Sequence, residues 1–149
     1  MKDWYEENVS ADFFRYRQFV MTVLQEEAAL SEIVRLVGMD ALSSKDRLTM
    51  ETAKIIREDY LHQNAFDDID TYTSMRKQFL MLKIIYEFDT RAREAVSNFA
   101  SVDEILLSKS KERIGRAKYI PEENLSEFDE ILKLIGAEMK ALQGGDRDV

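Results

Sequence analysis

The sequence predicts an all-α fold, a bundle of about five to six helices. Turn signals are scarce, because the 149 residues include one proline and five glycines. Apolar residues recur three and four positions apart, as on a helix face, and do not alternate as in a strand. A hydrophobic content of 45% without any cysteine allows a core that needs no disulfide. We expect one helical domain over residues 1–143 and a disordered tail over residues 144–149.

The first helix is predicted over residues 12–37. Ser10 is a candidate N-cap, since a serine hydroxyl accepts a hydrogen bond from a free amide of the first turn. Gly38 can take the left-handed conformation that ends a helix. The inward face of this helix consists of apolar residues at helical spacing, namely Phe13, Tyr16, Val20, Val23, Leu24, Ile33, Leu36 and Val37.

The second helix is expected to start after Ser43 or Ser44 and to stop near His62. Its inward positions are Leu48, Thr52, Ile55, Ile56 and Tyr60. The stretch QNAFDDIDTYTS that follows has no helical period and is rich in short polar residues, so it predicts a loop. Thr73 or Ser74 is expected to cap the next helix.

A long third helix is predicted from Met75, with Phe79, Leu82, Ile85, Phe88, Ala92, Ala95 and Phe99 on its inward face. Ser101 and Glu104 have the spacing of a capping box, which predicts a short helix over residues 102–107. The basic stretch KSKERIGRAK contains a glycine and is interpreted as a connection.

The last helix has the most regular apolar pattern, and Pro121 suits its first turn. Its inward positions are Leu125, Phe128, Ile131, Leu132, Ile135, Met139 and Leu142. We expect this seam to pack inside the core of the chain. The alternative is a self-associating coiled coil, but a seam shorter than about three heptads is short for an independent one.

Charge and chain pattern exclude several classes of protein. With 29 acidic and 21 basic residues the net charge is −8, so the domain would be repelled by nucleic acid and by anionic lipid. The N-terminus lacks the basic and then apolar order of a signal peptide. No stretch approaches the roughly 18 uninterrupted apolar residues of a membrane span. The sequence therefore predicts a soluble chain without direct membrane contact.

Catalytic and metal-binding patterns are missing from the sequence. It contains no GxxxxGK[ST] loop for phosphates, no cysteine, and one histidine, His62, which is interpreted as a surface residue. The acids at 67, 68 and 70 lack the glycine and final glutamate of a calcium loop. The adjacent acids at 26–27 and 122–123 are splayed on a helix and are expected to face solvent. We predict no catalytic residue and no metal site.

Three segments carry a family resemblance: LVGMDALSSKDRL, IIREDYLHQNAF and DIDTYTSMRKQF, preceded by WYEENV and LQEEAALSEIVRLVG. They resemble the C-terminal helical domain of the catalytic A subunit of archaeal-type and vacuolar-type rotary ATPases. The resemblance runs from about Trp4 to about Phe99, and more weakly through the last helix. Three departures are mild: Met39 stands where proline is usual, His62 where glutamine is usual, and Thr73 where cysteine is usual.

The resemblance implies a contact with the rotor in the turn between the first two helices. The positions that correspond to the rotor-facing DELSEED segment of F-type β subunits are Asp40, Ala41, Leu42, Ser43, Ser44, Lys45 and Asp46. Leu42 is a candidate apolar contact there. The nearby bases Lys45 and Arg47 offset the acids, so shape and stiffness are expected to dominate. Without the resemblance, the turn would be interpreted as a plain connection.

The resemblance implies a second site in the loop after the second helix. By position, Gln63, Asn64, Ala65, Phe66 and Tyr72 are expected to lie near the adenine of a nucleotide held by another domain. An adenine ring binds flat apolar groups, which Phe66 or Tyr72 could supply. The alternative is that these two aromatic residues only anchor the loop to the bundle.

The implied function is mechanical: the domain couples opening and closing of a nucleotide site to rotation of a central stalk. The implied partners are the remainder of the catalytic A subunit, the non-catalytic B subunit and the D subunit of the central stalk, in a cytoplasmic head peripheral to the membrane. ATP or ADP with magnesium would bind the complete catalytic subunit, and this chain alone is not expected to hydrolyse ATP. Two alternatives remain open: a free-standing helical adaptor, and a small enzyme that uses clustered acids.

Overall fold

The computed structural model describes residues 2–61 and 74–144, with side chains from residue 11 onward. Within these ranges every regular element is helical and no strand occurs, so the all-α prediction is confirmed. The predictions about His62, the loop at 63–73 and the tail from residue 145 lie outside the described residues. No helix in the described part combines the length and apolar character that crossing a bilayer requires.

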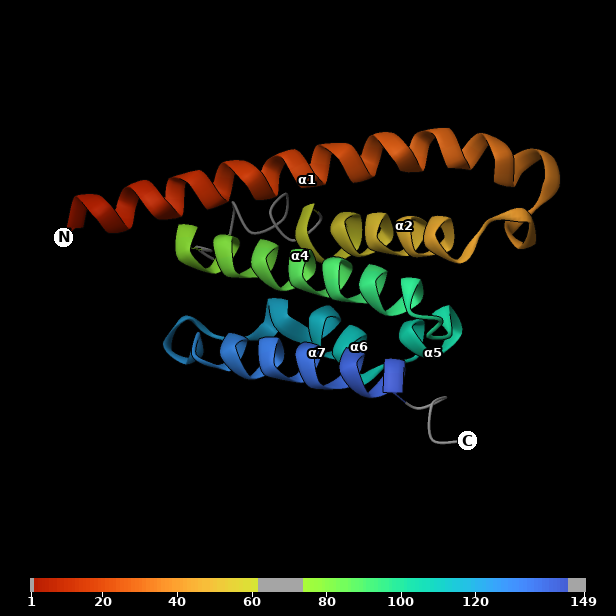
Figure 1. The fold of residues 1–149 in the computed structure, drawn as a ribbon. Helices are drawn as coiled ribbons and strands as arrows, with labels where there is room; N and C mark the ends of the chain where they lie inside the picture. Colours follow the sequence, from red (N-terminus) through yellow and green to blue (C-terminus); the bar gives the residue numbers. More distant parts are fainter. Residues whose placement is uncertain (1, 62–73, 145–149) are drawn as a thin grey trace.

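Helix α1 spans Lys2–Val37, and its 36 residues give a length of about 54 Å. The predicted start at residue 12 and the Ser10 cap are wrong, because the helix already runs through Ser10. On its inward face Tyr16, Val20 and Val23 are buried as predicted. The last turn differs: Ile33, Leu36 and Val37 are exposed, because α1 extends past the helices on which it packs (Figure 1).

Helix α2 spans Ser44–Ile55 and continues as a π-helical segment, η2, over Ile56–Leu61. The predicted N-cap is confirmed at Ser43, whose side chain accepts a hydrogen bond from the Asp46 amide. All five predicted inward residues of this segment are buried, which confirms the face chosen from the sequence: Leu48, Thr52, Ile55, Ile56 and Tyr60.

Helix α4 spans Met75–Ser97 and is capped by Ser74, as predicted. Its inward face is buried at Leu82, Ile85, Phe88, Ala92 and Ala95. The assignment of Phe99 to that face is wrong. The helix has ended by then, and Phe99 has a positive φ of 70° and is 90% exposed.

The short helix α5 spans Val102–Leu106, and Ser101 caps it by accepting from the Glu104 amide. A further helix, α6, spans Lys109–Arg116, where a connection was expected. It forms because Ser108 caps it and Ile114 is fully buried beneath it.

Two 3-10 turns follow, η3 over Ala117–Tyr119 and η4 over Glu122–Asn124. The last helix, α7, spans Glu127–Gly144, so Pro121 is the N-cap position of η4 and does not lie in the first turn of the last helix. The predicted seam of α7 is buried at Phe128, Ile131, Ile135 and Met139, and α4 is its main neighbour. The intramolecular interpretation of the seam is therefore confirmed.

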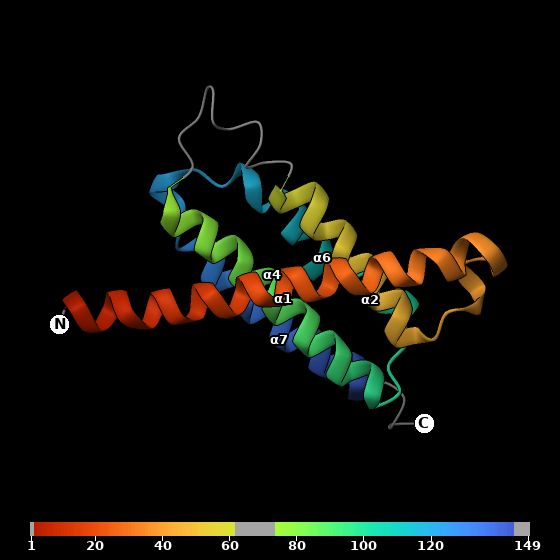
Figure 2. The same cartoon turned by 90° about the horizontal axis from the view of Figure 1, so that it is seen from above.

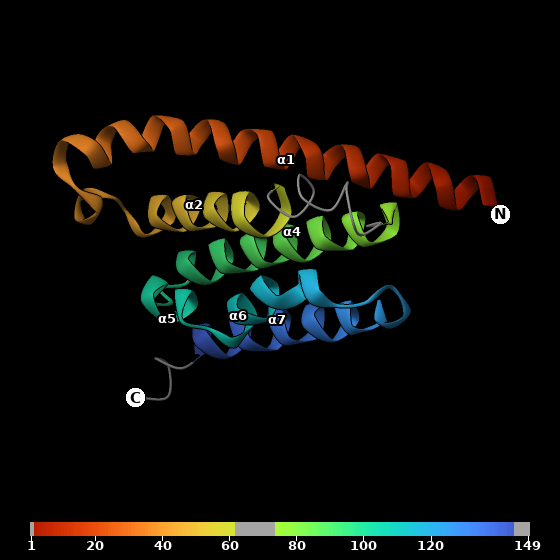
Figure 3. The ribbon, with the colours of Figure 1, turned by 180° about the vertical axis from the view of Figure 1, so that it is seen from behind.

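The helices form three layers (Figures 1 and 3): α1 on one face, α2 with α4 in the middle, and α5, α6 and α7 on the other face. Seen from above, α1 crosses α4 obliquely (Figure 2). Aromatic rings join these two helices, since Tyr16 of α1 lies 5.5 Å from Phe79 and 5.0 Å from Tyr86 of α4 between ring centroids. The central layer thus receives apolar contacts from both sides.

Candidate functional site

Residues 38–46, which join α1 to α2 and include the first three residues of α2, are called the tip turn below, and this segment is fixed at both ends. Gly38 ends α1 with φ 91° and ψ 165°, and its amide donates a 2.8 Å hydrogen bond to the Val34 carbonyl. Gly38 therefore ends α1 as predicted and has a positive φ, but its ψ shows that it does not adopt the predicted left-handed helical conformation. Residues Met39–Ala41 form a 3-10 turn, η1, and Ser43 then caps α2.

Most tip-turn side chains are open to solvent. Asp40, Ala41, Ser43, Ser44 and Lys45 are exposed, and Asp46 is partly buried. Leu42 is different because it is only 8% exposed. Leu42, which is predicted as a candidate apolar contact, therefore offers little surface to a partner.

The exposed apolar side chains beside the tip turn come from the end of α1 and from η1. Leu36 is 76% exposed, Val37 65% and Met39 44%. Sequence reasoning missed the first two because it placed them on the inward face of α1. Their spacing fits that face, but no neighbouring helix extends far enough to cover them.

The tip turn is not neutralised in the way expected from the sequence. Arg47 does not pair with Asp40 or Asp46; it donates a 2.6 Å hydrogen bond to Asp103 at the start of α5. Lys45 is therefore the only base of the tip turn beside its two acids.

The five residues expected near adenine, Gln63, Asn64, Ala65, Phe66 and Tyr72, lie outside the described residues. The structure describes the two segments that border this stretch. They are called the first stem, which is η2, and the second stem, which is Ser74 with the start of α4. On the first stem, the Lys118 ammonium donates a 2.8 Å hydrogen bond to Asp59, and this contact raises the pKa of Lys118. The Lys77 ammonium in turn donates to the Lys118 carbonyl at 2.8 Å.

On the second stem, Glu122 of η4 accepts hydrogen bonds from the Ser74 amide at 3.0 Å and from the Ser74 hydroxyl at 2.8 Å. The Ser74 amide lowers the pKa of the Glu122 carboxyl. Glu122 was expected only to face solvent, and nothing local in the sequence indicates a partner 48 residues away. The connection between α6 and α7 therefore holds both stems.

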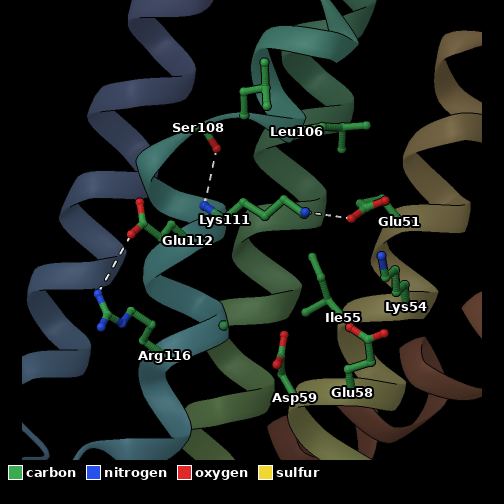
Figure 4. A pocket seen from close by; sticks show the side chains of 12 residues that line it. Glu51, Lys54, Ile55, Glu58, Asp59, Leu106, Ser108, Lys111, Glu112 and Arg116 are labelled. Carbon is green, nitrogen blue, oxygen red and sulfur yellow. Dashed lines mark hydrogen bonds and ion pairs between the residues drawn. The ribbon is translucent and has the colours of Figure 1, made fainter.

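A polar groove of about 450 Å³ lies between α2 and α6 (Figure 4). Lys111 of α6 reaches across it and donates to Glu51 of α2 at 2.7 Å. Arg116 and Glu112 form a looser pair along α6 at 3.9 Å. The Lys111–Glu51 ion pair thus bridges the two helices across the groove, whereas the Arg116–Glu112 pair lies within α6. Among residues 11–61 and 74–144, no group of three or more His, Cys, Asp or Glu side chains is placed to hold a metal ion.

Comparison with known proteins gives one family. Residues 2–106 match the family described as the C-terminal domain of V and A type ATP synthase. Three similar proteins all carry the name V-type ATP synthase alpha chain. The protein of Acetivibrio thermocellus is 52% identical over 140 residues, which cover 93% of this chain and 24% of that protein.

The protein of Thermoanaerobacter pseudethanolicus is 50% identical over 149 residues, covering 99% of this chain and 25% of that protein. That of Clostridium perfringens is 49% identical over 147 residues, covering 97% and 25%. This chain therefore spans about a quarter of the length of these relatives. The match to the relatives extends through α6 and α7, beyond the residues that the family match covers.

Proposed function

Because this chain belongs to the family of C-terminal domains of V- and A-type ATP synthases, we propose that its function is mechanical. In the complete catalytic protein it would couple opening and closing of the nucleotide site to rotation of the central stalk. Its partners would be the remainder of the catalytic A subunit, the non-catalytic B subunit and the D subunit of the central stalk. ATP or ADP with magnesium would bind the complete A subunit.

The main structural support for this proposal is the tip turn. It is exposed along most of its length, yet helix ends hold it at both sides, through Gly38 at the end of α1 and Ser43 at the start of α2. Helices are stiff over several turns, so a turn held by two of them moves with them. Such an element suits the transmission of a push to a rotating partner.

The partner contact would be largely apolar. Leu36 and Val37 beside the tip turn and Met39 within it are exposed apolar side chains close in sequence to its acids and base. Exposed ion pairs contribute only about 0–1 kcal/mol each, whereas covering apolar surface is favourable in proportion to its area. We therefore propose that the stalk contact consists of these three side chains and the residues of 40–46 other than Leu42, which is buried.

The second part of the proposal concerns the nucleotide. Gln63, Asn64, Ala65, Phe66 and Tyr72 would close over adenine, and the contacts of Lys118 and Glu122 with the two stems would hold that loop in place. Removing an aromatic face with Phe66→Ala and Tyr72→Ala should weaken nucleotide binding by the intact catalytic subunit. Unaltered affinity in both variants would eliminate this part.

The stalk contact is tested in the assembled enzyme with the double substitution Leu36→Ser and Val37→Ser. These side chains are largely exposed, so the fold should persist while the apolar contact is lost. We expect ATP hydrolysis to continue and ATP-driven ion transport per ATP to fall. The matched control is Phe14→Ser with Met21→Ser, since these residues are 64% and 55% exposed on the same helix. Equal transport in both double variants would contradict the proposal.

A further inference from the structure

A buried polar network joins α4 to α2. Asp89 of α4 is only 4% exposed, which is unusual for a carboxylate. One of its oxygens accepts a 2.6 Å hydrogen bond from the Thr52 hydroxyl of α2, and the other accepts a 2.8 Å hydrogen bond from Nε of Arg93. Asp89 is therefore satisfied from both helices.

The network continues from Arg93 to the tip turn. Nη2 of Arg93 donates a 2.7 Å hydrogen bond to the Thr49 hydroxyl. That hydroxyl donates in turn to the carbonyl of Lys45 at 3.2 Å. Lys45 is a residue of the tip turn and lies in the first turn of α2. A continuous series of hydrogen bonds thus runs from the middle of α4 to the tip turn.

Stability alone is a weak explanation for this arrangement. Both helices already contribute fully buried apolar residues, such as Leu48 and Phe88, to one hydrophobic cluster. A buried charged pair often contributes less to stability than apolar side chains of the same volume would. Hydrogen bonds differ from apolar contacts in being directional, so they fix the position of one helix along another.

We propose that Arg93 is a positioning residue, which acts through Thr49 to hold the tip turn at one place relative to α4. Asp89 orients the guanidinium by binding Nε, which leaves Nη2 directed at α2. The positioning follows from the geometry of this chain. Its consequence for coupling rests on the proposed function.

The first test measures hydrogen exchange of backbone amides in this chain. Thr49→Val keeps the shape of the side chain and removes the hydroxyl, whereas Thr49→Ser keeps the hydroxyl. We expect exchange to become about tenfold faster with valine, and to stay unchanged with serine, at the amides whose hydrogen bonds close the tip turn: Ala41, Leu42, Asp46 and Arg47. Amides of α7 exchange through global unfolding, so any change in their exchange rates should match the change that the variant makes in the free energy of unfolding.

Variants of Arg93 distinguish the hydrogen bonds of its guanidinium from the effect of its charge. Arg93→Lys keeps a cation beside Asp89 but lacks the fork that also reaches Thr49, so it should speed exchange at the tip turn as Thr49→Val does. The matched control is Arg91→Met on the same helix, since Arg91 is exposed and pairs only loosely with Glu87 at 3.7 Å. Unchanged tip-turn exchange in both Thr49→Val and Arg93→Lys would overturn the inference.

The second test uses the assembled enzyme and measures ions transported per ATP. We expect Thr49→Val to lower this ratio while Thr49→Ser leaves it unchanged. Faster exchange at the tip turn together with an unchanged ratio would support the positioning role of Arg93 and would contradict the proposed function. The two claims therefore fail by different results.

Discussion

The guanidinium of Arg47 lies 2.6 Å from the carboxylate of Asp103, and this contact joins the first turn of α2 to the first turn of α5. The two side chains are 32% and 70% exposed, so water and salt weaken their attraction. Arg93 of α4 contacts the same part of α2, so side chains of both α4 and α5 hold the start of α2. These two contacts differ in burial, so they should also differ in strength.

Breaking the exposed contact between Arg47 and Asp103 should lower the stability of the chain only slightly. We expect Asp103→Ala to lower the free energy of unfolding by less than about 1 kcal/mol, and the loss should shrink in high salt. Part of any loss comes from removing an acid near a helix N-terminus. Glu104→Ala is the matched control for that part, because Glu104 also lies in the first turn of α5. Urea unfolding at low and high salt measures both, and a salt-independent loss well above this bound would contradict the prediction.

Gly38→Ala should destabilise the chain through the backbone alone. At φ 91° and ψ 165° the backbone lies in a region that side chains with a Cβ rarely adopt. A Cβ added there would meet no heavy atom within 4 Å, so no steric clash adds to the cost. We expect a loss of about 1–3 kcal/mol in the free energy of unfolding, measured by urea titration.

The same substitution at Gly136 serves as the control for Gly38→Ala. Gly136 lies within α7, and a Cβ there also meets nothing within 4 Å. Alanine favours the helix, so Gly136→Ala should stabilise the chain by about 0.5–1 kcal/mol. If both alanine substitutions changed the free energy of unfolding in the same direction, the conformation of Gly38 would impose no special cost on a residue with a Cβ.

Phe99→Gly should stabilise the chain. Phe99 follows α4 with φ 70°, where glycine is usual, and the Ala100 amide closes the helix end on the Ala95 carbonyl at 2.9 Å. Its side chain is 90% exposed, so little burial is lost with it. We expect a gain of about 1 kcal/mol in thermal or urea unfolding. Phe99→Ala removes the ring but keeps the Cβ, and it should therefore give much less of this gain.

The helix faces and caps could be predicted from the sequence where local pattern and burial agree. The inward residues of α2 and the seam of α7 are buried as expected, because both helices lie against neighbours along their length. Ser43, Ser74 and Ser101 cap their helices because each has a side-chain oxygen three residues before the amide that it accepts from.

Helix α6 could not be predicted, because its stability comes from distant contacts. Glu138 of α7 accepts hydrogen bonds from the amides of Lys109 and Ser110 at the start of α6. Ser108 is a local cap, but a charged stretch that contains a glycine otherwise favours a helix only weakly, and burial of Ile114 together with this carboxylate stabilises it.

The candidate site was located only in part from the sequence. The resemblance pointed to the tip turn, and Gly38 and Ser43 bound it as expected. The exposure of Leu36, the burial of Leu42 and the contact of Arg93 with Thr49 depend on which helix lies beside which. A pattern along one helix does not contain that information.

Glu138 should make the stability of the chain depend on pH. Burial raises the pKa of the Glu138 carboxyl, but hydrogen bonds from the Ser110 hydroxyl and from the Ser110 and Lys109 amides outweigh it, so the net pKa lies below its ordinary value. A carboxyl with a lowered folded-state pKa stabilises the fold above its unfolded pKa of about 4.3. That contribution is lost as the pH falls through the lower folded-state value.

The variant Glu138→Gln removes the charge and one acceptor oxygen at the start of α6. At pH 7 we expect it to lower the free energy of unfolding by about 1 kcal/mol, since the carboxylate is partly exposed. The difference from the unmodified chain should persist down to about pH 4.3 and shrink below it, because the unfolded state then binds a proton at Glu138 and, below the lower folded-state pKa, the folded state does too. Glu130→Gln, on the exposed face of the same helix, is the control. Urea titrations from pH 7 to pH 3 measure the difference, and a gap that stays constant to pH 3 would mean that the charge of Glu138 does not stabilise α6.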